Sequence, residues 1–141
     1  MLVADVMTPL ALTIGPAHTL RDAARLMAGR RVGSAVVVDP ETAGLGIITE
    51  RDILVSLGLG EDPDRETADA HTTTEVVFAA PGWTLARAAD AMLRGGFRHL
   101  VVVDGGEIAG VLSVRDVLRG WSAARTGGTG LGQSGELVGT G

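Results

Sequence analysis

The feature that most constrains the fold of this chain is an internal repeat. Three blocks of sequence occur twice in the same order, and each second copy follows the first by 64 or 65 residues. The paired blocks are Thr19–Met27 with Thr84–Met92, Val36–Asp39 with Val101–Asp104, and Gly46–Leu54 with Gly110–Leu118. Self-similarity at a fixed spacing indicates one structural unit built twice. We therefore expect repeat 1 at residues 1–60 and repeat 2 at residues 61–121, joined by a polar linker around Gly60–Arg65.

Each repeat alternates helical and strand patterns. Apolar residues recur at helical spacing behind a threonine N-cap in blocks 19–27 and 84–92. Short valine-rich runs bounded by turn residues predict buried strands, each followed by a hairpin partner, at 35–38 with 45–48 and at 100–103 with 108–112. The remaining elements are short leading strands at 12–14 and 77–78, helical turns at 3–7 and 68–71, and second helices after Thr49 and Ser113. Each repeat therefore reads β-α-β-β-α, and the fold class is α+β.

The size of one repeat predicts that the two repeats pack against each other. A unit of about 55 residues leaves much of its apolar surface uncovered when it stands alone. We expect the two repeats to pack sheet to sheet with pseudo-two-fold symmetry. A further apolar face could then make the chain a homodimer.

Composition excludes several function classes. The formal net charge is −5, which argues against nucleic-acid binding. The chain has no cysteine and no lysine, so thiolate nucleophiles, cysteine-ligated zinc and Schiff-base chemistry are excluded. No apolar stretch is long enough to span a membrane, and a cytoplasmic location is expected. Seven of the last fifteen residues are glycine, which predicts a disordered, glycine-rich tail over 122–141.

One motif, Gly-x-x-Thr/Ser-x-x-Asp, ends the third block of both repeats. Its hydroxyl residue, Thr49 or Ser113, lies where a strand passes into a helix, and the free N–H groups of that helix favour an anion such as phosphate. The acidic residue, Asp52 or Asp116, lies one turn later and could accept hydrogen bonds from the two hydroxyls of a ribose. The arginines between them, Arg51 and Arg115, could add positive charge near the phosphate.

The same residues also have a purely structural interpretation. Thr-x-x-Asp or Ser-x-x-Asp at a helix start is typical of a capping box, which stabilises the helix by ~1 kcal/mol without any ligand. Duplication in a matched context favours a ligand site in at least one repeat. Glu50 places a carboxylate beside the first motif, where it would repel phosphate, whereas Val114 at the equivalent position does not.

Together, these blocks resemble the tandem cystathionine-β-synthase (CBS) domain pair. The resemblance covers residues 3–121 and includes Val3–Pro9 and Thr67–His71 ahead of the helix, strand and Gly-x-x-Thr/Ser-x-x-Asp blocks. It implies a stand-alone regulatory module, not an enzyme, that binds AMP, ADP, ATP or S-adenosylmethionine in clefts between the repeats and signals to an unknown regulated protein. It also implies disc-like dimers. No cofactor is expected beyond an adenine nucleotide as regulatory ligand.

The resemblance assigns further residues to the ligand site. Backbone groups and apolar walls would hold the adenine at Thr13, Ile14, Ser34, Ala35, Val77, Phe78, His99 and Leu100, with Arg98 and His99 at the edge of the cleft. By default these are ordinary strand and core residues. His18 and His71 lack metal-ligand spacing and are expected at the solvent-exposed surface. Two other functions stay open: a ligand-free structural or dimerisation module, and a nucleotide hydrolase, which is disfavoured because no metal cluster or activated nucleophile is evident.

Overall fold

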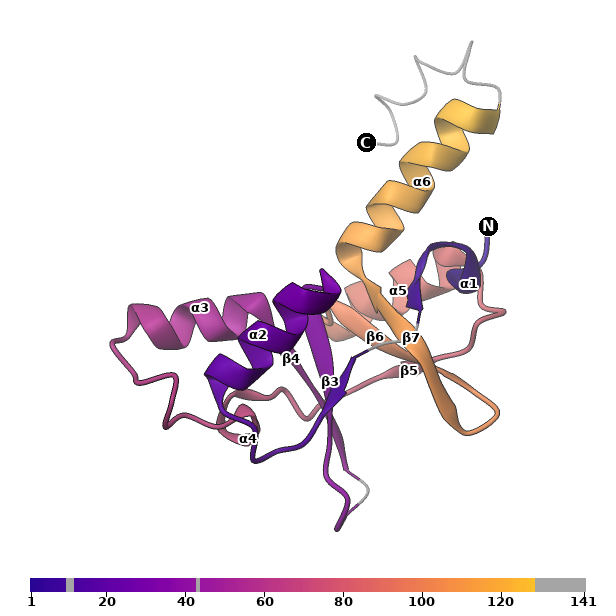
Figure 1. The fold of residues 1–141 in the computed structure, drawn as a ribbon. Helices are drawn as coiled ribbons and strands as arrows, with labels where there is room; N and C mark the ends of the chain where they lie inside the picture. Colours follow the sequence, from indigo (N-terminus) through magenta and orange to yellow (C-terminus); the bar gives the residue numbers. More distant parts are fainter. Residues whose placement is uncertain (10–11, 43, 129–141) are drawn as a thin grey trace. The chain divides into compact units, whose positions relative to one another are not determined.

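The computed structural model describes residues 1–9, 12–42 and 44–128 of the 141-residue chain (Figure 1). The chain divides into two compact units. One comprises residues 10–76 and is called here the N-repeat unit; the other comprises residues 1–9 together with residues 77–141 and is called the C-repeat unit. Both mix helices with a small sheet, in agreement with the predicted α+β class.

The N-repeat unit contains a three-stranded sheet in the order β2-β3-β4. Its first two strands are parallel and its last two are antiparallel. In chain order the elements are β2 (Thr13–Ile14), α2 (Leu20–Arg30), β3 (Ser34–Val38), β4 (Leu45–Thr49), α3 (Glu50–Gly58) and α4 (Ala68–His71). The predicted β-α-β-β-α order is confirmed. The core is built from small and branched apolar side chains, among them Leu20, Met27, Ala35, Val37 and Ile48.

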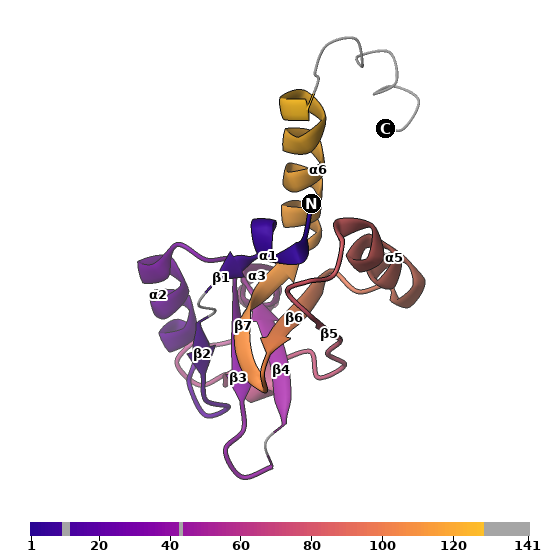
Figure 2. The ribbon, with the colours of Figure 1, turned by 90° about the vertical axis from the view of Figure 1, so that its right-hand side faces the viewer.

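The C-repeat unit repeats this plan and adds one strand, giving the sheet order β1-β7-β6-β5 (Figure 2). Strands β5 and β6 are parallel, whereas β6–β7 and β1–β7 are antiparallel. Its elements are α1 (Val3–Val6), β1 (Thr8–Pro9), β5 (Phe78–Ala79), α5 (Leu85–Gly95), β6 (His99–Asp104), β7 (Glu107–Ser113) and α6 (Val114–Gly128). The short strand predicted at 77–78 is therefore found one residue later.

The first long helix of each repeat begins at the predicted threonine. Thr19 Oγ accepts a hydrogen bond from the Asp22 N–H (3.1 Å), and Thr84 Oγ accepts one from the Arg87 N–H (3.1 Å). In the reciprocal hydrogen bond, the Asp22 carboxylate accepts from the Thr19 N–H (3.3 Å), and the pair forms a capping box. The helices end at equivalent places, because Arg31 and Gly96 both adopt the left-handed conformation that terminates a helix.

The segment that leads into repeat 1 lies in the C-repeat unit. The Val3 N–H donates to the Trp83 carbonyl (2.8 Å), and the Leu85 N–H, at the start of α5, donates to the Met1 carbonyl (3.2 Å). Further along, β1 extends the sheet by pairing with β7. The side chain of Val3 is fully buried. Residues 1–9 thus complete the fold of the second repeat, although they precede the first repeat in the sequence.

The segment that leads into repeat 2 lies, in the same way, in the N-repeat unit. The Ala68 N–H donates to the His18 carbonyl (2.7 Å), and the Leu20 N–H donates to the Glu66 carbonyl (3.0 Å). Thr73 then forms a bridge to Ile47 of β4, which corresponds to the pairing of β1 with β7. The compact units therefore exchange their leading segments and do not follow the sequence boundary expected at residue 60.

The motif glycines are required by this exchange. A Cβ atom on Gly46 would overlap Thr72 Cγ2 and stand 3.0 Å from the Thr73 carbonyl oxygen. A Cβ atom on Gly110 would overlap the carbonyl oxygen of Thr8. In each unit, the exchanged segment runs beside the strand that carries the glycine, and a Cβ atom at that position would overlap the segment.

The disordered tail predicted over residues 122–141 is wrong for residues 122–128. Helix α6 continues to Gly128, so residues 122–128 are helical. The guanidinium of Arg125 stacks on the ring of Trp121 at 4.2 Å, one helical turn away, and this contact stabilises the added turn. The rest of the predicted tail, residues 129–141, lies outside the described residues.

Candidate ligand-binding site

In the N-repeat unit, the predicted hydroxyl and carboxylate meet where β4 passes into α3. Thr49 is the N-cap of α3. Asp52 Oδ2 accepts from both the N–H (2.8 Å) and the hydroxyl (2.9 Å) of Thr49, whose Oγ accepts from the Asp52 N–H (3.2 Å). This is a capping box, so the structural interpretation of the motif is realised here. Among the described residues, no group donates to the second carboxylate oxygen, Oδ1, and the side chain is half-buried.

The C-repeat unit has the same box with one addition. Asp116 Oδ2 accepts from the Ser113 N–H (2.9 Å), and Ser113 Oγ accepts from the Asp116 N–H (3.1 Å). The other oxygen, Oδ1, is paired with the guanidinium of Arg119, one turn along α6. Asp116 is only 4% exposed, whereas the Arg119 side chain is 68% exposed. The two carboxylates therefore differ: Asp52 Oδ1 has no donor among the described residues, whereas Asp116 Oδ1 is paired with Arg119.

The helix starts retain fewer free N–H groups than the sequence suggests. The first N–H of α3, from Glu50, donates to the Gly33 carbonyl (3.0 Å), and the first N–H of α6, from Val114, donates to the Arg98 carbonyl (3.0 Å). The third N–H of each helix is used by the capping box. An anion would therefore meet the N–H of Arg51 or Arg115 in the first turn, and the side chains of both arginines are exposed.

Cross-strand pairing brings further predicted residues to the motifs. Ser34 pairs with Thr49 across β3 and β4, and His99 pairs with Ser113 across β6 and β7. Each of these two side chains is half-buried. Arg98 precedes its strand and is exposed. In each unit, therefore, a polar side chain of the neighbouring strand, Ser34 or His99, lies across from the hydroxyl residue of the motif.

The remaining predicted residues divide into core and surface. Ile14 (5% exposed) and Ala35 (0%) lie in the apolar core, so only their backbone could face a ligand. Val77 is half-buried against the core of its unit. Thr13 and Phe78 are exposed, and Phe78 has 47% of its surface open.

Sequence reasoning missed two features. Arg119 follows Asp116 by three residues, and this helical spacing could have indicated the ion pair. The prediction that His71 is solvent-exposed was wrong, because its side chain is 18% exposed and its ring contacts Glu66. His18 is likewise half-buried, with its ring nitrogen accepting from the Gly15 N–H (3.0 Å).

None of the helices in the described residues combines the length and hydropathy that crossing a membrane requires. The family model "CBS domain" matches the chain twice, over residues 3–58 and 68–122. A curated relative, an uncharacterised 17.7 kDa protein of Acidianus ambivalens, is 34% identical over 118 residues, which span 83% of this chain and 71% of that protein. Two further relatives are longer: the chain spans 41% of MJ1225 of Methanocaldococcus jannaschii and 20% of CBSCBSPB3 of Arabidopsis thaliana.

Solved structures are similar across most of the chain. A hexameric CBS-CP12 protein from bloom-forming cyanobacteria has a TM-score of 0.76 at 26% identity, covering 84% of this chain and 66% of that one. The CBS domain protein PAE2072 from Pyrobaculum aerophilum, solved in complex with AMP, has a TM-score of 0.70 at 27% identity and covers 88% of this chain and all of that one. With two family matches placed on the two observed repeats, the chain belongs to the CBS-domain family as a tandem CBS pair.

Proposed function

We propose that this chain is a regulatory module that binds an adenosine-containing ligand at its strand-to-helix junctions and passes the ligand state to a partner protein. The ligand class is AMP, ADP, ATP or S-adenosylmethionine. The observation that carries the proposal is the Asp52 carboxylate, which is fixed by its capping box while Oδ1 stays available to accept from a ribose hydroxyl. The AMP bound to the similar protein PAE2072 supports the same ligand class.

The geometry favours repeat 1 for the stronger ribose contact. Asp52 needs no rearrangement to accept a hydroxyl through Oδ1, whereas Asp116 must first release Arg119. Glu50, which would repel a phosphate, has an exposed side chain that lies near Gly33, with Oε1 3.2 Å from where a Cβ on that glycine would be. An exposed carboxylate can turn into solvent at little cost.

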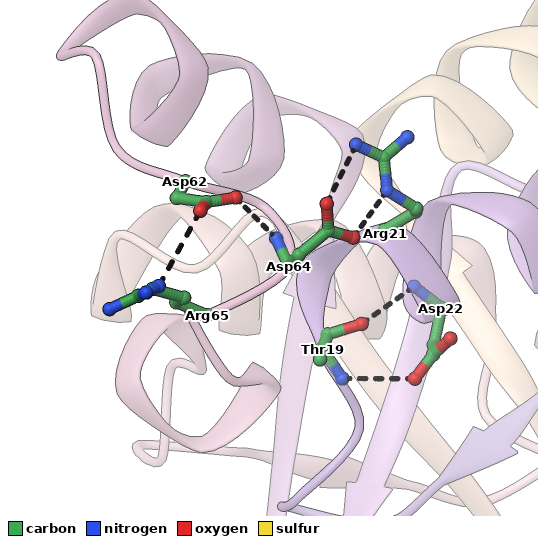
Figure 3. Close-up of polar contacts among 6 residues, drawn as sticks. All are labelled: Thr19, Arg21, Asp22, Asp62, Asp64 and Arg65. Carbon is green, nitrogen blue, oxygen red and sulfur yellow. Dashed lines mark hydrogen bonds and ion pairs between the residues drawn. The ribbon is translucent and has the colours of Figure 1, made fainter.

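Ligand-dependent melting of matched variants tests the proposal. Asp22 provides the control, because it forms the same capping box at the start of α2 without the motif (Figure 3). Each of Asp22→Ala, Asp52→Ala and Asp116→Ala removes the carboxylate of a capping box and should lower the unfolding free energy by about 1 kcal/mol or more. Only Asp52→Ala and Asp116→Ala should also reduce the rise in melting temperature with ligand, and Asp52→Ala should reduce it more.

The result depends on ligand concentration in a known way. Ligand at 100 times its Kd stabilises the folded state by about 2.7 kcal/mol, which is readily measured at millimolar nucleotide. Nucleotide recovered unchanged after incubation is expected of a binding module, and turnover would contradict it. The absence of any shift with all four ligands, or an equal loss of the shift in Asp22→Ala, would refute the proposed site.

The alternative function is a ligand-free structural module that forms dimers. It is favoured by the completed capping boxes and by exposed apolar side chains on the helices that follow the motifs. On α3 these are Leu54, Val55 and Leu57, with Leu59 at its C-cap, and on α6 they are Val114, Leu118 and Trp121. The hexameric assembly of the similar CBS-CP12 protein supports a second copy of this chain as their partner.

Sedimentation separates the two functions. Leu54→Gln on α3 should weaken self-association, whereas Leu93→Gln on α5, where the leucine is 83% exposed, should not. Self-association that is unaffected by all four ligands favours the structural module. A ligand-dependent change in association favours the regulatory one.

A further inference from the structure

A second polar cluster lies away from the motif, in the segment that leads into repeat 2. Glu61 follows α3, Glu66 precedes the N-cap of α4, and His71 is the last residue of α4. His71 Nε2 lies 2.8 Å from Glu66 Oε1 and 3.8 Å from Glu61 Oε1. One potential ligand atom from each of the three residues lies within 4.8 Å of the other two. All three residues belong to the N-repeat unit.

The neighbouring carboxylates of this segment are already balanced by arginine. Asp64 is bonded to Arg21 through two contacts, of 2.5 and 3.1 Å, and Asp62 lies 3.7 Å from Arg65 (Figure 3). Glu61 and Glu66 have no such partner among the described residues, where their polar side-chain contacts are His71 and the hydroxyl of Ser56. Two carboxylates held together with one imidazole leave negative charge that a divalent cation would neutralise.

The cluster is held in place by its surroundings. Ser56, which is 1% exposed, donates its hydroxyl to Glu61 Oε1 (2.7 Å) and so fixes the direction of that carboxylate. The Glu66 carbonyl accepts from the Leu20 N–H (3.0 Å), which anchors the backbone to the start of α2. Buried partners of this kind orient the ligands of protein metal sites.

We propose that Glu61, Glu66 and His71 form a binding site for a divalent transition metal, zinc being the best match. One imidazole nitrogen with two carboxylate oxygens is a donor set that zinc accepts, and three protein ligands leave a fourth position for water. Bond lengths of about 2.0–2.1 Å place tetrahedral ligand atoms about 3.4 Å apart. The two separations from His71 Nε2, 2.8 Å to Glu66 Oε1 and 3.8 Å to Glu61 Oε1, lie on either side of that value.

The exposure of the cluster suits an exchangeable ion. The side chains of His71, Glu66 and Glu61 are 18%, 30% and 36% exposed. An ion could therefore enter from solvent and keep a water ligand. Once bound, it would join the end of α3, through Glu61, to the end of α4, through His71.

Titration of the full chain with Zn²⁺ and with Co²⁺, after treatment with a chelator, tests this site. Calorimetry should show saturable binding of one ion per chain, and Co²⁺ should give the visible absorption of a four-coordinate site with nitrogen and oxygen ligands. His71→Gln and Glu66→Gln should each weaken the affinity more than tenfold, because each removes a ligand where even a second-sphere change costs 10–100-fold.

The matched control is Asp69→Asn, which removes one negative charge from an exposed residue of α4 outside the cluster. It should leave the affinity within about twofold of the parent. Circular dichroism in chelator verifies that each variant is folded, and AMP binding by His71→Gln should remain, because the motif residues are untouched. Non-saturable binding, or an equal loss in Asp69→Asn and Glu66→Gln, would show that the three residues form only an ion pair in an acidic segment.

Discussion

The close approach of the exchanged segment to Gly46 predicts a large effect from the smallest possible substitution. Gly46→Ala would place its methyl carbon in overlap with Thr72 Cγ2 and 3.0 Å from the Thr73 carbonyl oxygen. Forcing an extra carbon into a packed site costs about 1–3 kcal/mol. This outweighs the ~0.5–1 kcal/mol that alanine gains over glycine in a strand. We expect a net loss of about 1–2 kcal/mol in unfolding free energy and a fall of roughly 4–8 °C in melting temperature.

A second substitution identifies the clash as the cause. Thr72→Ser removes Cγ2 and keeps the hydroxyl, which donates to the Ala68 carbonyl (2.5 Å). The Gly46→Ala/Thr72→Ser double variant should therefore recover about 1 kcal/mol of the loss, leaving the contact with the Thr73 carbonyl. Gly110→Ala should cost more than Gly46→Ala and resist such rescue, because its methyl meets the backbone oxygen of Thr8.

Urea unfolding of these variants, with the m-value compared among them, measures the effect. Gly29→Ala in α2 is the control, since its added methyl meets nothing within 4 Å. It should stabilise the protein by about 0.5–1 kcal/mol through helix propensity alone. If Gly46→Ala is as stable as Gly29→Ala, or if Thr72→Ser recovers nothing in its background, the segment does not lie against β4 as the structure places it.

Three further outcomes follow from single contacts. Thr49→Ala and Ser113→Ala should each lower the unfolding free energy by about 1 kcal/mol through loss of a cap, as measured by urea titration. The hydrogen bond from Arg21 holds the pKa of Asp64 below its ordinary value of 3.8. The charged carboxylate therefore contributes stability above about pH 4 and loses it as pH falls through the lowered pKa, so melting curves of the parent and Asp64→Asn should converge in acid. Arg119→Val should raise the ligand affinity of repeat 2 in calorimetry, because it frees Asp116 Oδ1.

The elements and their caps could be predicted from the sequence because both are local. A helix is encoded by apolar spacing within a few residues, and a capping box joins residues three apart, as Thr19 and Asp22 are. The close approach at Gly46 and Gly110 is different, because the atoms that a Cβ would meet belong to segments distant in sequence, Thr72–Thr73 and Thr8.

The exchange of leading segments could not be predicted in this way. The hydrogen bond between Val3 and Trp83 joins residues some 80 positions apart. The spacing of apolar residues indicates that a helix or strand forms, but it does not indicate which other segment that element packs against. The same limit explains the wrong prediction for His71. Its carboxylate neighbours stand five and ten residues before it, a spacing typical of no helical or strand motif, and they converge because the segment folds back against α2.

The two motifs are alike in sequence and yet differ in the hydrogen bonds of their carboxylates, and the difference lies one helical turn beyond them. Arg119 reaches back to Asp116, whereas Val55 holds the equivalent position after Asp52 and has no group to donate. The internal repeat thus predicts the positions of both carboxylates. The residue three positions after each aspartate, Val55 or Arg119, determines whether the second carboxylate oxygen has a side-chain donor. Because a buried carboxylate that loses a charged partner is costly, Asp116 should exchange Arg119 only for a ligand that restores both hydrogen bonds and charge balance. Under the proposed function, ligand should therefore occupy Asp52 at a lower concentration than Asp116.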